Sequence, residues 1–437
     1  MFDPVNEPLF RLDVAGLPDA FEVLAFTGNE AISEPFVFEV DLLINDPSLD
    51  LASLLYRAAF LHFDASGNGI HGQFHQIEQR EHGHASRLCR VRMGPKLACL
   101  GQRFSQRIFS ARSVPQILRQ VLKEHGIVGK DWRLQLSAEY PVRDFCTQYR
   151  ESDLQFFQRL CAEEGLHYYF EHSRRGHCLI VSDAQAPSQT AEELVFHDHG
   201  DPVLLSRFEV QMGVQKVPVT EGSTELATLR SGQLMPLSTE PFNQRNRLWR
   251  LIEIEHRGTQ DPQFSYANTI RAIPCEAPLI TPQRLAKPRM LSLQRAWVVD
   301  VEELRPEPSR PIAVQFDWLY QGEGAKSDHC WLALAPELQS AAFASWPAGT
   351  EVVVSFIGGD PDQPLITGLL NSPLAIDAIE PPMPLPSEAP DGLLALLQSS
   401  EPLVLLCLLP GGGSFRHCRE TVCTCRAATL FGQSGAA

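Results

Sequence analysis

The chain has 437 residues, 44% of them hydrophobic and 21% charged, which is the balance of a soluble globular protein with several domains. Its formal net charge of −16 argues against a broad surface for phosphate backbones, so we expect no nucleic-acid partner. Glu401 and Pro402 interrupt the most apolar stretch, 393–409, and the N-terminus lacks a basic region followed by an apolar run. We therefore expect folding in the cytoplasm, and any export to proceed without a signal peptide.

The first hundred residues have the pattern of short strands separated by Gly, Pro, Asn or Asp. This spacing favours an antiparallel barrel or sandwich, because helices need a longer apolar periodicity. The predicted strands are Phe10–Val14, Phe21–Thr27, Phe36–Leu43, Ala59–Asp64 and Gln73–Gln79.

Two helices are predicted next, Ser113–Gly126 and Ser152–Gly165. Each begins with S-x-x-Q, a capping-box pattern, and each ends on a glycine suited to a left-handed cap. Their apolar stripes predict core faces, formed by Val114, Ile117, Leu118, Val121 and Leu122 in the first helix and by Leu154, Phe157, Leu160 and Cys161 in the second. A hairpin with the turn SRRG, residues 173–176, follows.

More strand-like runs between Leu194 and Ile273 predict a second barrel-like unit, and the proline-rich segment Pro274–Pro288 marks its end. Five short strands then lie within about eighty residues, a pattern typical of a small Greek-key barrel such as an OB-fold. They are Gln294–Val301, Pro311–Phe316, Cys330–Leu334, Glu351–Ile357 and Leu365–Leu370.

The run GGDPDQP, Gly358–Pro364, predicts a tight turn between the last two of these strands. Its glycines permit positive φ, and Asp360 and Asp362 are able to close Asx-turns. Calcium is the alternative, because acidic loops bind hard cations, but the further ligands of a known calcium loop are missing. We favour the structural turn.

Two groups of polar residues invite a catalytic hypothesis. Glu151, Asp153, Glu163 and Glu164 flank the second helix and suggest the paired carboxylates of a glycosidase; we favour a structural role, since acidic groups suit a helix start. The second group comprises His71, His75, His82 and His84, which lack the H-E-x-x-H zinc signature and which we interpret as solvated strand residues.

The cysteines divide into two sets. Seven of the 11, from Cys89 to Cys330, stand in mostly apolar contexts and are expected to be reduced core thiols. In the tail, His417, Cys418, Cys423 and Cys425 are weak candidates for a metal site, because C-x4-C-x-C is not a standard zinc spacing. Oxidation-prone free thiols or packed thiols are the alternatives. No P-loop, G-x-G-x-x-G or G-x-S-x-G motif occurs, so we predict neither catalytic residues nor a cofactor.

Several long runs, in the same order, resemble the VgrG family of type VI secretion systems, and together they cover roughly the first 370 residues. They are Phe26–Leu43, Ser105–Ile127, Arg143–His172, Val314–Trp318 with Cys330–Trp331, and Pro347–Gly368. The most specific is Arg143–His172, RDFCTQYRESDLQFFQRLCAEEGLHYYFEH, which in the family is the helix-and-hairpin insertion of the hub domain.

The resemblance implies a mainly β fold with α insertions. A phage tail hub-like domain of two β-barrel units is expected at 1–287, with a helical insertion at about 105–172, and an OB-fold domain at 288–371. A proline-rich linker at 372–391 and a short apolar, Cys-rich tail at 392–437 follow. The family usually continues into a long β-helix needle; the Val-Gly repeats of a needle are missing here, so a short variant without it is expected.

The function implied is that of a non-enzymatic spike, a homotrimer that caps the secreted tube, helps to puncture a target membrane and delivers effectors. Expected partners are the tube protein, with a tip protein and effectors as further candidates, and the membrane only during injection. The protein is expected to assemble in the cytoplasm and then to be secreted. The alternatives are the hub of a phage-like contractile particle and an effector-bearing cell-wall hydrolase.

Overall fold

The structure of the chain is a computed structural model. In it the chain forms two compact units, residues 1–371 and residues 372–437, and each is described by itself. None of the helices in its described part is long and apolar enough to cross a membrane. The structure describes residues 10–46, 48–82, 86–183, 190–191, 194–196, 207–212, 217–239, 247–261, 265–279, 286–302, 309–318, 329–338, 346–371, 403–407 and 413–417.

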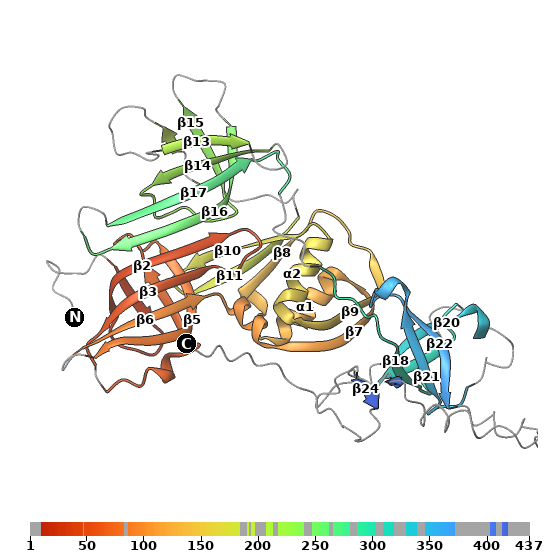
Figure 1. Ribbon diagram of the computed structural model, residues 1–437. Coiled ribbons are helices and arrows are strands. Elements are labelled where there is room, and N and C mark those ends of the chain that lie inside the picture. Colours follow the sequence, from red (N-terminus) through yellow and green to blue (C-terminus); the bar gives the residue numbers. More distant parts are fainter. Residues whose placement is uncertain are drawn as a thin grey trace, which may run out of the picture. The chain divides into compact units, whose positions relative to one another are not determined.

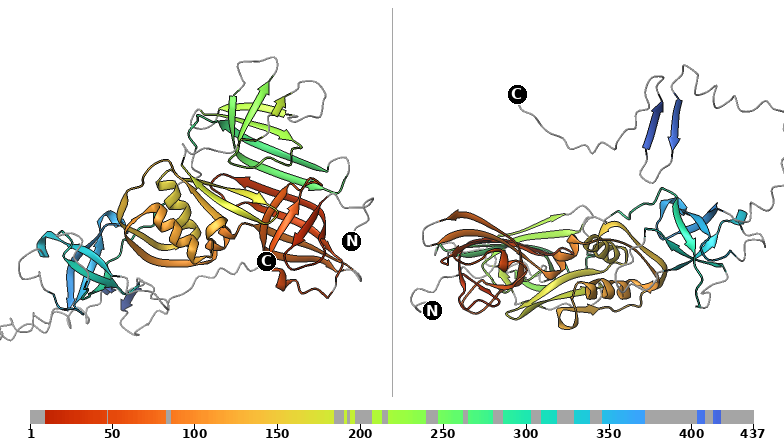
Figure 2. Two further views of the ribbon diagram at one scale, coloured as in Figure 1. Left: turned by 180° about the vertical axis from the view of Figure 1, so that it is seen from behind. Right: turned by 90° about the horizontal axis from the view of Figure 1, so that it is seen from below.

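Six antiparallel strands form the first barrel: β1 (Arg11–Val14), β2 (Phe21–Ala31), β3 (Val37–Ile44), β4 (Ala58–His62), β5 (Gly69–His82) and β6 (Arg87–Gly94). Neighbours follow the order β1-β4-β5-β6-β3-β2, and β1 also pairs with β2, which closes the ring (Figure 2). Strand β3 shows why these residues form a barrel wall: Phe38, Val40 and Leu42 alternate with polar or half-buried residues and are fully buried. The predicted early strands are confirmed.

The insertion, residues 95–183, carries the helices. It comprises a 3-10 helix (Lys96–Gln102), β7 (Phe104–Ser113), α1 (Val114–Glu124), a 3-10 turn (Gly129–Asp131), β8 (Trp132–Gln135), β9 (Val142–Ser152), α2 (Asp153–Glu163), β10 (His167–Ser173) and β11 (Gly176–Ser182). Both helices begin with the predicted capping box, at Ser113 and Ser152. Strands β7 and β9 form a ribbon that carries α1 and α2 (Figure 1). The hairpin turn at 173–176 is confirmed by the pairing of β10 with β11.

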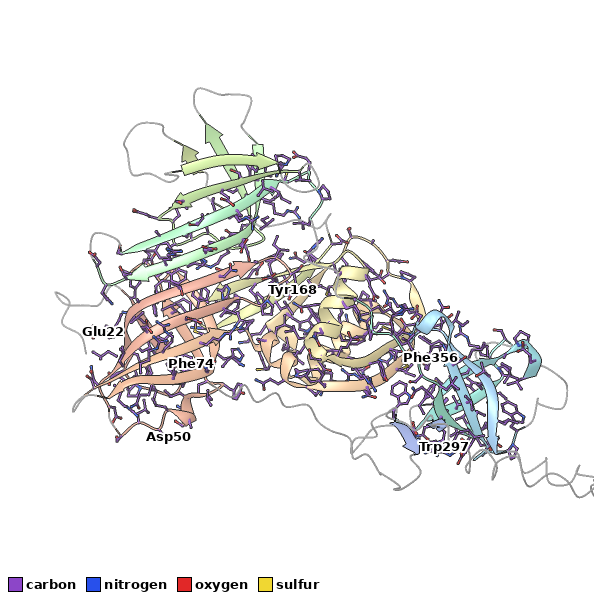
Figure 3. All side chains as sticks on the ribbon, viewed as in Figure 1. Glu22, Asp50, Phe74, Tyr168, Trp297 and Phe356 are labelled. Atoms are coloured by element: carbon purple, nitrogen blue, oxygen red, sulfur yellow. The ribbon has the colours of Figure 1, made fainter. Side chains whose placement is uncertain are left out.

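The buried face of α2 differs in part from the prediction. Phe157, Leu160 and Cys161 are buried as expected, but Leu154 is only partly buried, and Phe156 is fully buried in its place. Arg159 is also on the buried side, at 1% exposure, where its charge meets Glu151 of β9 and Glu163 of α2 itself. The apolar stripe of the helix does not reveal the contact with Glu151, because that partner lies on another element. The core of the insertion is continuous with that of the first barrel and includes Phe74 and Tyr168, labelled in Figure 3.

A second group of strands follows the insertion: β12 (Leu194–Phe196), β13 (Arg207–Met212), β14 (Pro218–Thr224), β15 (Leu234–Thr239), β16 (Arg247–Thr259) and β17 (Tyr266–Pro274). Strand β16 pairs with β17 and β15 on this side and with β2 of the first barrel, so the two strand groups share one sheet. A separate apolar cluster around Trp249, Leu251 and Ile270 fills this group.

The small barrel is closed by five strands in the order β18-β19-β20-β22-β21. They are β18 (Gln294–Val298), β19 (Ile312–Phe316), β20 (Cys330–Leu334), β21 (Glu351–Phe356) and β22 (Pro364–Asn371), with short 3-10 turns at Pro336–Leu338 and Ile357–Gly359. Strand β20 is parallel to β22 and the other pairs are antiparallel, which is the arrangement of an OB-fold. All five predicted strands are present.

The described residues of the second unit form a hairpin, β23 (Leu403–Cys407) with β24 (Gly413–His417). The predicted linker at 372–391 lies outside the described residues, as does the rest of the tail. The described part of the chain is therefore a mainly β fold with helices inserted between strand groups.

Candidate functional site: the junction between the insertion and the small barrel

The loop between β21 and β22 is the predicted tight turn. Gly358 and Gly359 both have positive φ, 63° and 77°, and the backbone N–H of Asp362 donates to Oδ1 of Asp360 at 2.9 Å, an Asx-turn. The ammonium of Lys287 lies 2.6 Å from Oδ1 of Asp360 and 2.6 Å from Oδ2 of Asp362. A side-chain cation thus balances both carboxylates, which argues against the calcium alternative.

This loop contacts β9 of the insertion. The backbone N–H of Thr147 donates to Oδ1 of Asp362 at 2.6 Å, and the Thr147 hydroxyl donates to the carbonyl oxygen of Pro361 at 2.9 Å. Apolar contact accompanies these bonds, because Phe145 and Tyr149 of β9 belong to the hydrophobic core of the small barrel. The small barrel is therefore docked on the insertion by both polar and apolar contacts. We call Lys287, Asp360, Asp362, Thr147 and Arg159 the junction.

Arg159 lies on the other side of Thr147. Its guanidinium donates from Nη2 to the Thr147 carbonyl oxygen at 3.1 Å and to Oε1 of Glu151 at 2.6 Å. Burial raises the pKa of Glu151, and the hydrogen bonds and charge of Arg159 oppose that shift. The junction is therefore continuous from Asp362 through Thr147 and Arg159 to Glu151.

Asp153, at the first position of α2, is the centre of a second ionic cluster. Its Oδ2 accepts from Nε of Arg103 at 2.6 Å and contacts Nε2 of His125 at 2.7 Å, while Gln148 donates to Oδ1 at 2.8 Å. Burial alone would raise the pKa of Asp153, but these donors and the charge of Arg107 outweigh it and hold the pKa below its usual value.

The two acids at the end of α2 are also in ion pairs. Arg143 donates to Oε2 of Glu163 at 2.7 Å and also pairs with Glu164. Each of the four carboxylates behind the glycosidase hypothesis therefore pairs with an arginine. A glycosidase needs one carboxyl held protonated as an acid and a second free to act as base or nucleophile. These geometries give structural ion pairs instead.

The interpretation of solvated histidines is wrong for two of the four. His71 and His75 are half-buried, and Nδ1 of His71 lies 3.0 Å from Nδ1 of His177 on β11. Burial lowers the pKa of both His71 and His75. The prediction of solvent exposure failed because β11 packs against β5 here. Strand β11 is about a hundred residues away in sequence, so the local pattern around His71 gives no sign of it. His82 ends β5, and His84 lies outside the described residues.

The tail candidates stay untested. His417 is the last residue of β24, and Cys418, Cys423 and Cys425 lie outside the described residues. Within the described ranges, no group of three His, Cys, Asp or Glu side chains is arranged to hold a metal. In the part of the chain that the structure describes, the seven other cysteines form no disulfide; four of them are buried, Cys89, Cys146, Cys161 and Cys330, and the remaining three are half-buried.

Sequence reasoning missed Lys287, Thr147 and Arg159. Lys287 stands in a proline-rich segment with no local pattern, and Thr147 is one of many strand threonines. Arg159 did leave a signal: it lies four residues before Glu163 and next to Leu160 of the predicted apolar stripe, so an arginine there predicts a buried partner.

Comparison with known proteins finds phage tail hub and VgrG proteins as relatives. The family model of the phage tail baseplate hub (GPD) matches residues 29–220. The type VI secretion system spike protein VgrG4b of Pseudomonas aeruginosa is 32% identical and aligned over 84% of this chain and 57% of its own length. VgrG5 of the same organism is also 32% identical, over 85% of this chain and 58% of its own. The chain thus spans less than three fifths of the length of these two relatives.

Solved structures agree in fold. An E. coli component of the type VI secretion system, described as similar to T4 bacteriophage tail proteins gp27 and gp5, matches with a TM-score of 0.69 and 23% identity, over 82% of this chain and 99% of that one. A VgrG-containing complex from Francisella matches with a TM-score of 0.55 and 8% identity, over 95% of this chain and 84% of that one.

Joined strand groups, an inserted helical ribbon and a docked small barrel define the phage tail hub-like class of folds. Within that class, sequence similarity over most of the chain is to type VI spike proteins. Over most of its length the chain is a homologue of VgrG proteins.

Proposed function

We propose that this chain is a non-enzymatic spike of a type VI secretion system, a homotrimer at the tip of the secreted tube that helps to puncture target membranes and deliver effectors. Its spike relatives and the hub-like fold support this role. The observation that carries it is the junction, because a spike under thrust has to transmit force between its domains without hinging.

The junction suits that task through its geometry. Asp362 is bonded both to the Lys287 ammonium and to the backbone N–H of Thr147, each at 2.6 Å. The Thr147 carbonyl is in turn bonded to Arg159, which is 1% exposed. Hydrogen bonds to charged groups in a buried setting are stronger than neutral ones and fix orientation as well as distance. Force on the small barrel therefore reaches helix α2 through directional contacts.

Domain limits and partners are part of the proposal. We place a tail hub-like domain at 1–287, an OB-fold domain at 288–371, a linker at 372–391 and a tail at 392–437. The small barrel and the segment before it carry exposed apolar side chains, Leu291, Leu293, Ile357 and Leu370, which support burial against other copies of the chain. The tube protein, a tip protein and effectors are the further partners, and membrane contact is confined to injection after assembly in the cytoplasm.

Sedimentation of the full chain at micromolar concentration tests the trimer. We expect a mass of three chains for the wild type, and a monomer for Leu293→Asp, which puts a charge into the proposed interface. The control is Asp317→Ala, which removes an exposed ion pair with Arg295 in the same barrel and keeps the trimer. A wild-type monomer of intact length would refute the homotrimer.

Secretion of the tube protein tests the junction. In a strain whose own copy of the gene is deleted, we expect the wild-type chain to restore secretion and Asp362→Ala to restore it at least fivefold less, with Asp317→Ala as control. Equal secretion by wild type and Asp362→Ala would mean that the junction does not transmit force. A clear zone produced by the purified chain on cell-wall substrate would instead favour the hydrolase alternative.

A further inference from the structure

A cavity of about 380 Å³ lies between the first barrel and the insertion. Its wall comes from β4 and β5, from the 3-10 helix Lys96–Gln102, from the segment after α1, and from β10 and β11. We propose that this cavity is a binding site for an apolar body that carries one carboxylate, and that its ligand is the C-terminal residue of a partner polypeptide. The proposal does not depend on the trimer or on the junction.

Charge at the cavity is opposite to that of the whole protein. Lys96, Lys130 and Arg175 line it against a single acid, Asp131, although the chain has a net charge of −16. Lys96 is anchored by a hydrogen bond from Nζ to the Gly126 carbonyl oxygen at 2.6 Å. Lys130 and Arg175 are both exposed at this cavity. Two cations at the mouth are therefore available to an incoming anion.

The histidine pair adds a donor whose tautomer is fixed by its neighbours. The backbone N–H of Lys96 donates to Nε2 of His177 at 3.3 Å, so in the neutral ring Nδ1 of His177 carries the hydrogen. That hydrogen is donated to Nδ1 of His71, 3.0 Å away, which leaves the hydrogen of His71 on Nε2. His71 lines the cavity, and its Nε2–H is thus a neutral donor for a carboxylate oxygen.

Most of the remaining wall is apolar, with Gln73 as a further polar residue. Leu97, Ile127, Phe170 and Leu179 line the cavity and are each 1–3% exposed, so their side chains form a preformed floor. A pocket of this kind, mostly apolar with a few convergent polar groups, is the usual form of a ligand site. An apolar residue on this floor brings its terminal carboxylate to the cationic mouth.

Tyr56 holds an unusual position at the same cavity. Its φ is 63°, a left-handed conformation that bulky residues rarely adopt, and its side chain is half exposed. The conformation is held by the hydrogen bond from Tyr56 N–H to the Phe74 carbonyl oxygen at 2.8 Å and by edge-to-face contact with His75. Residues in strained backbone conformations cluster at ligand sites. Here the strained conformation of Tyr56 places its aromatic ring at the cavity.

Calorimetric titration of the full chain tests the proposal with four probes: N-acetyl-leucine, N-acetyl-leucinamide, leucine and inorganic phosphate. We expect saturable binding of N-acetyl-leucine, with the amide and phosphate at least tenfold weaker, since one lacks the carboxylate and the other the apolar body. Leucine separates two sources of the same chemistry. Weaker binding of leucine supports a polypeptide terminus, and tighter binding, with its ammonium near Asp131, would assign the site to a free amino acid and overturn the polypeptide ligand.

Variants locate the site. Arg175→Ala combined with Lys130→Ala should weaken N-acetyl-leucine at least tenfold, while Lys123→Ala, an exposed cation on α1 outside the cavity, should leave it unchanged. All three positions are exposed, so folding is expected to persist and is checked by the unfolding transition. Absence of saturation, equal affinity for the amide, or full affinity in the double variant would each overturn the proposal.

Discussion

Nε2 of His256 lies 2.9 Å from Oε1 of Glu30, although the two residues are 226 positions apart. Both are 1% exposed, and Nδ1 of His256 contacts the Tyr266 hydroxyl at 2.8 Å. The contact crosses the seam at which β16 pairs with β2, so it joins the second strand group to the first barrel. Burial lowers the pKa of His256 against the hydrogen bond and charge of Glu30. A polar contact at this place favours one register, because a one-residue slip would separate the two side chains.

Removal of this contact should be costly. We expect His256→Ala to lower the free energy of unfolding by about 2–4 kcal/mol, since it leaves the buried Glu30 carboxyl without its donor. Arg271→Ala is the control: it removes an exposed ion pair with Glu253 near the same seam and should cost less than about 1 kcal/mol. Denaturant unfolding measures both. If both variants lost the same free energy of unfolding, the buried contact would contribute no more to stability than the exposed ion pair.

Phe157 tests the packing of α2. The side chain is fully buried and meets Tyr168 edge to face with ring centroids 5.4 Å apart. Phe157→Ala should therefore cost about 3–5 kcal/mol. Leu154→Ala on the same helix, at a partly buried position, should cost less than half as much. A loss below about 1 kcal/mol for Phe157→Ala would contradict the placement of this face.

Gly359 tests the turn of the small barrel. Gly359 has φ 77°, so Gly359→Val strains the backbone, and its Cβ, 2.8 Å from Cδ2 of Leu291, also forces that exposed side chain to move. We expect a loss of about 1–3 kcal/mol, with parallel loss of soluble trimer and of secretion. Gly358→Val is the matched control, because φ is 63° there and nothing lies within 4 Å of a Cβ. The excess cost of Gly359→Val measures the contact with Leu291. If trimer yield stayed at the wild-type level while secretion disappeared, this loop would have a direct contact role.

The half-buried histidine pair, His71 and His177, predicts a pH dependence. Burial lowers the pKa of His177 to about 3, with the neighbouring His71 as the next cause, whereas an unfolded histidine has a pKa of about 6.5. As pH falls below about 6.5 the unfolded chain takes up a proton that the folded chain refuses, so stability is full above that pH and is lost progressively towards about 3. At pH 5 the loss from this residue is about 2 kcal/mol. His177→Gln should remove that part of the difference in unfolding free energy between pH 7.5 and pH 5. An unchanged difference would exclude His177 as a source.

Local patterns in the sequence were enough for several elements. The capping boxes at Ser113 and Ser152 start the two helices as predicted, and the turn at Gly358–Gly359 has the positive φ that its glycines permit. The five strands of the small barrel were also visible, since their apolar residues alternate between Gly- and Pro-rich turns. These features depend on interactions between residues that are only a few positions apart, so a local sequence pattern is enough to predict them.

Only the tertiary structure decided where the polar side chains find their partners. Glu30 meets His256, His71 meets His177, and Asp362 meets Thr147 across separations of 226, 106 and 215 residues. The seam between β2 and β16 and the docking of the small barrel on β9 were equally hidden. A titratable side chain on a strand has the same sequence appearance whether water or another strand covers it. Its burial and its charge partner are set by elements distant in the chain, because packing of apolar faces brings them together.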